Sequence, residues 1–307
     1  VNGCFDDAQT GVKNIFADRA FADKLAENGV KLSSANSINW GRLVPQIAYY
    51  VYSYVDLLRR EKIEMGEEIN IVVPTGNFGN ILAAWYAKQM GIPMHRLLCA
   101  SNKNKVLCDF FATGTYDRRR EFFKTNSPSM DILISSNLER LLFEVSGKDA
   151  SKVSTWMKEL NENGVYTVDP QTLKTLQRLF VGGFADEAGI TKTIIDVYDR
   201  TDNVIDTHTA VGFNIYNRYH QRSKDETKTV FASTASPFKF APAVMDAIKG
   251  AGYSNGRSNE TIISELSKES GLPIPATLAD ISKREVRHTM KIEKDQMEET
   301  VKNILVK

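Results

Sequence analysis

The residues whose types and spacing most clearly favour chemistry form a glycine-rich turn. It consists of Gly76, Asn77, Phe78, Gly79 and Asn80. An apolar run over residues 69–73, typical of a buried strand, precedes the turn, and residues 81–90 follow with helical spacing. A strand, a glycine turn and a helix together direct several backbone N–H groups at one anion. Glycines are needed there if a ligand approaches the backbone closely or if φ is positive. An ordinary tight turn between a strand and a helix has the same local pattern.

Thr234 is a second candidate because it follows a predicted strand over residues 228–232. In open α/β sheets, ligands bind outside the carboxyl ends of the strands. A hydroxyl at that place can hydrogen-bond a weakly basic ring nitrogen without forcing its protonation. Capping of the following helix is an equally good interpretation of this threonine.

The polar loop over residues 37–42 is a third candidate, since it leads into a predicted helix that ends near residue 62. The N-terminus of that helix and the Arg42 side chain together could bind a phosphate through charge-assisted hydrogen bonds. A surface arginine without a ligand fits the same pattern, and the local sequence does not favour either interpretation.

Several common catalytic and metal-binding motifs are absent from the sequence. The four histidines are dispersed, and none lies in an HExxH or Cys/His pattern, so no metal site is predicted. The sequence also lacks a Walker-type phosphate loop and a GxGxxG dinucleotide motif. What remains is a phosphate-sized turn without a lysine, in a fold that can hold a cofactor at the ends of its strands.

Composition is that of an ordinary globular protein. The chain has 307 residues, of which 42% are hydrophobic and 25% charged, and its formal net charge is +1. This length permits a large core and two lobes. A near-neutral charge gives no electrostatic reason to predict nucleic acid or a membrane as the main partner. No apolar run approaches the roughly 18–20 residues that span a bilayer. Three cysteines without metal-ligand spacing indicate reduced thiols and a cytoplasmic protein.

The predicted elements alternate between strands and helices along most of the chain. A first helix is expected over residues 6–28, with Val12, Ile15 and Phe21 on one face. Short strands are expected over residues 30–32, 69–73, 96–100, 130–134, 165–168 and 228–234, and a strand or turn over residues 182–185. This alternation predicts an α/β fold with a mostly parallel sheet and helices on both faces.

The start of the chain has the pattern of a strand already under way. Residues 1–5 are followed at once by Asp6 and Asp7, which favour a helix N-terminus. Because a domain rarely starts in the middle of a sheet, we expect the chain to be the C-terminal part of a longer protein.

Seven motifs in order along the chain resemble those of the threonine synthase family, in its longer microbial and fungal branch. They are V-N-G-x-F-D-D at residues 1–7, N-S-I-N-W-G-R at 36–42, P-T-G-N-F-G-N at 74–80, S-P-S-M-D-I at 127–132, S-S-N-L-E-R at 135–140, D-x-H-T-A-V-G at 206–212 and S-T-A-S-P-x-K-F at 233–240. Each motif is of moderate specificity, but together they span nearly the whole chain. The resemblance implies the tryptophan-synthase-β-like fold, fold type II of the pyridoxal-phosphate enzymes, with three αβα layers and a truncated, mostly parallel sheet.

The resemblance also implies a cofactor, a reaction and site residues. Pyridoxal 5′-phosphate would bind the turn residues Gly76, Asn77, Phe78, Gly79 and Asn80 through its phosphate, and Thr234 through its pyridine nitrogen. The reaction would convert O-phospho-L-homoserine and water to L-threonine and phosphate, the last step of threonine biosynthesis, by γ-elimination and β-addition of water. Candidates for binding the substrate phosphate, which lie in loops matching the family motifs, are Asn39, Arg42, Ser129 and Asn137.

The family's Schiff-base lysine belongs to an N-terminal S-F-K-D motif, which this sequence lacks. The resemblance therefore implies that the catalytic lysine lies in a missing N-terminal lobe and that the chain alone is inactive. Residues 1–68 would belong to the large domain and the substrate loop, 69–254 to the cofactor-binding domain, and 255–307 to a C-terminal helical extension. Two alternatives stay open, namely another fold-type-II lyase such as a serine or threonine dehydratase, and a non-catalytic relative that binds a phosphorylated ligand.

Overall fold

Four parallel strands form the centre of the structure, in the order β5-β2-β1-β6. The computed structural model describes residues 1–3 and 5–306. The strands are β1 (Ile69–Pro74), β2 (Met94–Ser101), β5 (Phe180–Phe184) and β6 (Thr229–Phe231). β1 pairs in parallel with both β2 and β6, and β2 pairs in parallel with β5. The predicted parallel sheet is thus confirmed.

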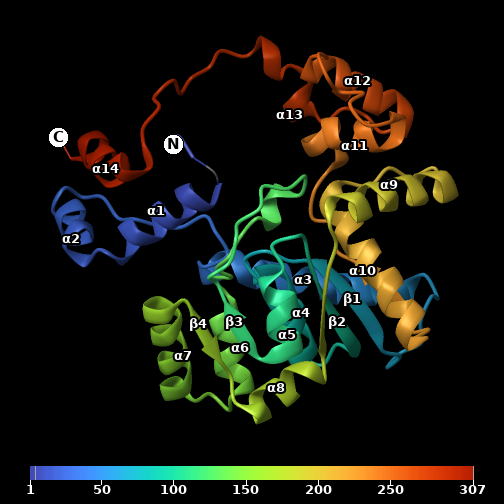
Figure 1. The fold of residues 1–307 in the computed structure, drawn as a ribbon, viewed down its shortest axis with the longest axis horizontal. Coiled ribbons are helices and arrows are strands. Elements are labelled where there is room, and N and C mark those ends of the chain that lie inside the picture. The colour runs from blue at the N-terminus through green and yellow to red at the C-terminus, as the bar shows by residue number, and fades with distance from the viewer. Residues whose placement is uncertain (4, 307) are drawn as a thin grey trace.

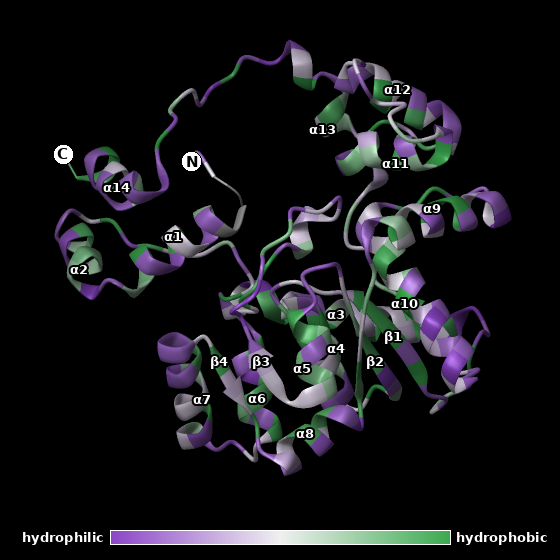
Figure 2. Cartoon of the chain, in the orientation of Figure 1, coloured by the Kyte–Doolittle hydropathy of each residue, from purple (hydrophilic) through white to green (hydrophobic). Residues whose placement is uncertain are grey.

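Helices cover both faces of this sheet, because side chains of neighbouring residues in a strand point to opposite faces. Ile71 and Val73 of β1 pack into one core with α3 (Trp40–Arg59), α4 (Gly79–Gln89) and α5 (Val106–Thr113). Val72 packs into a second core on the other face. The helices of that second core are α9 (Glu187–Thr201), α10 (Thr207–Ser223), α11 (Ala241–Lys249) and α12 (Asn259–Ser270). The strands β1 and β2 are correspondingly hydrophobic in Figure 2, and the arrangement is the predicted αβα sandwich.

A smaller unit packs beside the sheet (Figure 1). Its two antiparallel strands are β3 (Thr115–Asp117) and β4 (Val165–Thr167). The helices around them are α6 (Leu138–Val145), α7 (Ala150–Asn163) and α8 (Pro170–Gln177). The predicted strand over residues 165–168 therefore exists, but it belongs to this second sheet rather than to the central one.

The two ends of the chain lie close together (Figure 1). Between β6 and α11 lies the short segment η2 (Pro237–Phe240), and the segments after α12 are α13 (Ala276–Ala279), η3 (Ile281–Lys283), η4 (Lys294–Gln296) and α14 (Met297–Leu305). Met297 of α14 packs with Ile15, Phe21 and Leu25 in a small core that is separate from the two main ones. In the described part of the chain, no helix combines the length and the apolarity that crossing a membrane requires.

The predicted helix over residues 6–28 is wrong in one respect, because it is two helices, α1 (Phe5–Ala17) and α2 (Arg19–Glu27). Asp18 separates them and accepts a hydrogen bond from the Phe21 N–H at 2.9 Å, as an N-cap residue does. The predicted initial strand is reduced to a single bridge between Asn2 and Glu293, and Cys4 lies outside the described residues.

Two other predicted strands are absent from the described structure. Residues 30–32 are irregular because the Val30 N–H bonds to the Leu25 carbonyl as α2 ends, which leaves the segment packed on the small terminal core. Residues 130–134 follow a short 3-10 helix, η1 (Pro128–Met130). There the Asp131 carboxylate is buried and bound to neighbouring side chains and loop backbone, in place of a strand ladder.

Candidate functional site

A cavity of about 310 Å³ opens at the carboxyl end of β1. All five residues of the glycine turn line it, from Gly76 to Asn80. Ser129 and His208 lie on another side, and Thr234 on a third. Segments that are far apart in the sequence therefore meet where β1 ends, which is the place where open α/β sheets bind ligands.

The two glycines of the turn are required for space and not for backbone conformation. A Cβ added to Gly76 would lie 2.8 Å from the Ser129 carbonyl oxygen, and one added to Gly79 would lie 2.5 Å from the Ser37 hydroxyl oxygen. Neither glycine has a positive φ. A positive φ, one of the two reasons for glycine that the sequence offered, is not observed. The groups that approach these glycines closely are the protein's own Ser129 and Ser37, and close approach of a ligand stays a prediction.

The residue of the turn with a left-handed backbone is Phe78, with φ of 65° and ψ of 0°. A bulky residue rarely adopts this conformation, which costs on the order of 1–3 kcal/mol unless its surroundings enforce it. The Phe78 side chain is 1% exposed, and its ring lies 6.1 Å from that of Phe111 and 5.8 Å from that of Phe180. Packing of the Phe78 ring against Phe111 and Phe180 thus stabilises the left-handed backbone at this position of the turn.

The helix α4 begins at Gly79, so its first turn faces the cavity. An α-helix leaves the N–H groups of its first turn without acceptors inside the helix, and the helix dipole places partial positive charge there. Gly79, Asn80 and Ile81 all line the cavity. No lysine, arginine, aspartate or glutamate is among the described residues that line it. An anion in this cavity would therefore be held by backbone dipoles and neutral polar groups.

The amide of Asn80 is held in one orientation by α3. The Tyr50 hydroxyl donates to Asn80 Oδ1, and Asn80 Nδ2 donates to Gln46 Oε1 at 3.3 Å. Burial raises the pKa of Tyr50 well above its usual value, so this hydroxyl stays protonated and remains a donor at physiological pH. Sequence reasoning did not find Tyr50 and Gln46, because only the tertiary packing of α3 against α4 brings them to the turn.

A loop over residues 127–132 forms the opposite side of the cavity, and buried polar groups anchor it. Asn102 follows β2 and donates from Nδ2 to Asp131 Oδ1 at 2.7 Å and to the Ser127 hydroxyl at 3.1 Å. Asn104 Nδ2 also donates to Asp131 Oδ1, at 3.0 Å. The end of β2 thereby fixes both ends of this loop, and Ser129 stands between the anchored positions.

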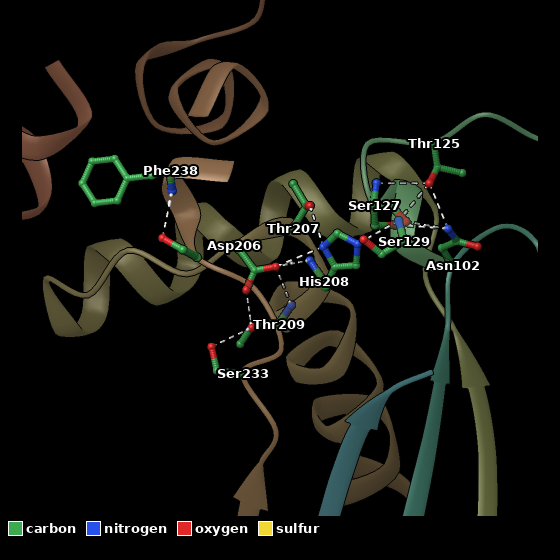
Figure 3. Close-up of polar contacts among 11 residues, drawn as sticks. Asn102, Thr125, Ser127, Ser129, Asp206, Thr207, His208, Thr209, Ser233 and Phe238 are labelled. Carbon is green, nitrogen blue, oxygen red and sulfur yellow. Dashed lines mark hydrogen bonds and ion pairs between the residues drawn. The ribbon is translucent and has the colours of Figure 1, made fainter. Parts of the chain in front are cut away.

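His208 was not singled out by the sequence, yet it lines the cavity. Its Nδ1 lies 3.1 Å from Asp206 Oδ1, and its Nε2 accepts a hydrogen bond from the Ser129 N–H at 3.2 Å. Figure 3 shows the imidazole between the Asp206 carboxylate and Ser129. Asp206 is also the N-cap of α10, accepting from the His208 N–H at 2.8 Å. The sequence signal was the Asp-x-His at the start of a helix, which by itself indicates only a cap.

Thr234 lies at the cavity three residues beyond the end of β6. The alternative interpretation, a cap for the following helix, is not what the structure shows. Ser236 performs that function, accepting a hydrogen bond from the Phe238 N–H at 3.3 Å at the start of η2. The position of Thr234 is thus compatible with a contact to a ligand ring.

The four residues predicted to bind a substrate phosphate occupy different places. Ser129 lines the cavity. Asn137 is buried behind the turn, where its Nδ2 donates to the Asn77 carbonyl and the Ser37 hydroxyl, both at 2.9 Å. Asn39 caps α3 by accepting from the Gly41 N–H at 2.9 Å, and Arg42 is exposed and does not line the cavity. Their roles toward a substrate stay predictions.

Comparison with known proteins shows which proteins this chain resembles. The model for the C-terminal part of threonine synthase matches residues 209–304. Human "Threonine synthase-like 1" is 43% identical over 251 residues, covering 81% of this chain and 33% of the relative. Threonine synthase of Saccharomyces cerevisiae is 36% identical over 279 residues, covering 86% of this chain and 52% of the relative. The chain is a relative of the threonine synthases.

Solved structures of the family agree with the fold. The pyridoxal-phosphate-bound threonine synthase of Brucella melitensis superposes with a TM-score of 0.77 at 32% identity, covering 100% of this chain and 59% of that one. Yeast threonine synthase gives a TM-score of 0.78 at 32% identity, covering 99% and 57%. The predicted resemblance and fold type II are therefore confirmed, and pyridoxal phosphate is a cofactor of this family. The chain spans about a third to a half of the length of the curated relatives that it matches.

Proposed function

We propose that this chain is the cofactor-binding portion of a threonine synthase, which converts O-phospho-L-homoserine and water to L-threonine and phosphate. The observation that carries the proposal is the cavity itself. A glycine turn and a helix N-terminus form one side of it, and a threonine hydroxyl lies on another, as a phosphate and a ring nitrogen of one ligand would require. The family relationship supports the same assignment.

In this proposal, the N–H groups of Gly79, Asn80 and Ile81 bind the 5′-phosphate of pyridoxal phosphate. Asn80 is pre-oriented by Tyr50 and Gln46, so little ordering is needed when the ligand enters. The Thr234 hydroxyl donates to the pyridine nitrogen and leaves it unprotonated, because a hydroxyl is too weak an acid to transfer its proton. When bound, the cofactor supplies an electron sink for the bonds broken at the substrate carbons.

The catalytic lysine is proposed to come from an N-terminal lobe outside this chain. The absence of lysine among the described residues that line the cavity supports this assignment. Lys239 lies in η2 with its Nζ over the Phe240 ring, 5.3 Å from the ring centroid, and not among the residues lining the cavity. We keep the division into residues 1–68, 69–254 and 255–307 as part of the same proposal.

Two measurements test the function. Full-length protein containing this chain is expected to release phosphate from O-phospho-L-homoserine and to form threonine in equal amounts. Release of ammonia from threonine or serine instead would favour a dehydratase, and binding without turnover of any of these substrates would favour a non-catalytic relative. The chain by itself is expected to bind pyridoxal phosphate reversibly, and a stoichiometric adduct on a single lysine after borohydride reduction would refute the proposed position of the catalytic lysine.

A further inference from the structure

His208 is the one imidazole among the described residues that line the cavity. Nothing in the proposed chemistry uses it. Its side chain is 2% exposed and that of Asp206 is 0% exposed, so this histidine is held inside the protein, at the edge of the cavity. The Phe240 ring packs against the imidazole with 4.7 Å between the ring centroids.

The hydrogen bonds of the imidazole ring indicate which of its two nitrogens carries the proton. A backbone N–H can only donate, so His208 Nε2, which meets the Ser129 N–H at 3.2 Å, carries no proton. The Asp206 carboxylate accepts, so His208 Nδ1, at 3.1 Å from it, carries the proton. The imidazole is therefore neutral, with a fixed tautomer and a fixed orientation. The lone pair of its Nε2 accepts from the backbone of the 127–132 loop.

We propose that His208 is a positioning residue that holds Ser129 at the distance from the glycine turn that a phosphate ester requires. The Ser129 carbonyl oxygen would lie only 2.8 Å from a Cβ at Gly76, so this loop and the turn are already in contact. A small displacement of Ser129 would change the space in front of Gly76. Asp206 acts through His208, and it ties the position of Ser129 to the start of α10.

The anchoring of the loop explains why this one bond matters. Asn102 binds the loop at Ser127 and at Asp131, which leaves Ser129 between two fixed points. His208 supplies a contact to that middle residue from the start of α10, across 79 positions of sequence. Without it, the middle of the loop can move while both of its ends stay in place.

The inference rests on the proposed function in one respect, namely that the ligand of this cavity carries a phosphate. The test compares the affinities of the full chain for pyridoxal 5′-phosphate and for pyridoxal, which differ only in that group. His208→Ala is expected to weaken binding of pyridoxal 5′-phosphate about fivefold, the effect of losing one neutral hydrogen bond, and to leave pyridoxal binding unchanged. His208→Gln is expected to restore most of the affinity, because its amide oxygen can accept from the Ser129 N–H.

Two further variants provide a substitute for the alanine variant and a control. His208→Leu fills the space beside Phe240 without a ring nitrogen, so it replaces the alanine variant in the test if that variant is poorly folded. It is likewise expected to weaken binding of pyridoxal 5′-phosphate and to leave pyridoxal binding unchanged. His220→Ala is the matched control on the same helix, where the ring is at the surface with its Nε2 3.2 Å from Glu226 Oε1. It is expected to bind both ligands as the unmodified chain does.

The outcomes separate this inference from the proposed function. Equal weakening of both ligands by His208→Ala and His208→Leu, or no weakening of either, would overturn the positioning role. Failure of His208→Gln to bind pyridoxal 5′-phosphate better than His208→Leu would also overturn it. If the unmodified chain binds pyridoxal as tightly as pyridoxal 5′-phosphate, the proposed function fails, whatever the variants do.

Discussion

Replacing Gly76 with alanine places one methyl group between the glycine turn and the 127–132 loop. The new Cβ would lie 2.8 Å from the Ser129 carbonyl oxygen, against 3.4 Å for an ordinary contact, a deficit of about 0.6 Å. The atom in the way belongs to the backbone, which His208 contacts at the Ser129 N–H and Asn102 contacts at the Ser127 carbonyl. Overpacking of this kind costs about 1–3 kcal/mol. We expect Gly76→Ala to lower the free energy of unfolding by that amount and to weaken binding of pyridoxal 5′-phosphate at least tenfold, the factor that about 1.4 kcal/mol produces.

Urea denaturation and equilibrium binding measure the two effects, and two glycine variants serve as references. At Gly79 the added Cβ would lie 2.5 Å from the Ser37 hydroxyl oxygen and 2.6 Å from the Ser37 Cβ. Because rotation of the hydroxyl does not move the Ser37 Cβ, Gly79→Ala should also cost about 1–3 kcal/mol. Gly41→Ala, in an exposed first helical turn, should cost nothing. If Gly76→Ala unfolds and binds like Gly41→Ala, the contact between turn and loop is not rigid and the reasoning fails.

Three other experiments test a buried tyrosine, a charged aspartate and a buried cysteine. Tyr50→Phe removes the donor to Asn80 and should lower the free energy of unfolding by about 1–3 kcal/mol, measured in urea. The Arg119 side chain lowers the pKa of Asp117 to about 2 by hydrogen bonding, so this carboxylate stabilises the folded state above its unfolded pKa of about 3.9 and loses that effect as the pH falls toward 2. Asp117→Asn should thus be less stable than the unmodified chain at pH 6, and the difference should shrink between pH about 4 and about 2. Burial raises the pKa of Cys99 to about 12, so iodoacetamide at pH 8 should label it, by mass spectrometry, only as fast as the fold opens.

Each of these three has a control or a contrary outcome. Tyr52 is on the same helix and 66% exposed, so Tyr52→Phe should leave stability unchanged. A stability difference for Asp117→Asn that persists unchanged at pH 2 would show that the Arg119 pairing is not its cause. Cys108 is only partly buried, and labelling of Cys99 at the rate of Cys108 would contradict its enclosure.

The sequence predicted the glycine turn because its signal is local, whereas the conformation inside the turn depends on distant residues. Phe78 adopts a left-handed backbone because its ring is fixed against Phe111 and Phe180, and no local pattern contains that information. The wrong strand over residues 130–134 has a similar origin. The segment is mostly apolar, but Asp131 binds Asn102 and the loop backbone, and these bonds replace a strand ladder.

The site could be predicted in part for the same reason. Gly76, Asn80 and Thr234 end or follow predicted strands, so topology alone brings them to one edge of the sheet. His208 stands at a helix start that the sequence predicted, but its contact is with Ser129, in a loop 79 positions away in the sequence. Orientation of side chains across such distances follows from packing and not from periodicity.

The residues that line the cavity indicate how ligand binding and bond-breaking would be divided between this chain and the rest of the protein. Its described lining contains no charged side chain that could hold an anion or form a covalent bond with an aldehyde. What it offers is the N-terminus of α4, an oriented asparagine, a neutral histidine and four hydroxyl side chains. In the proposed function these groups bind and orient a phosphate and a ring, because a helix dipole and neutral donors favour an anion. Bond-breaking needs a nucleophile and a base, and in the proposed function both must come from the part of the protein that faces this cavity from outside the chain.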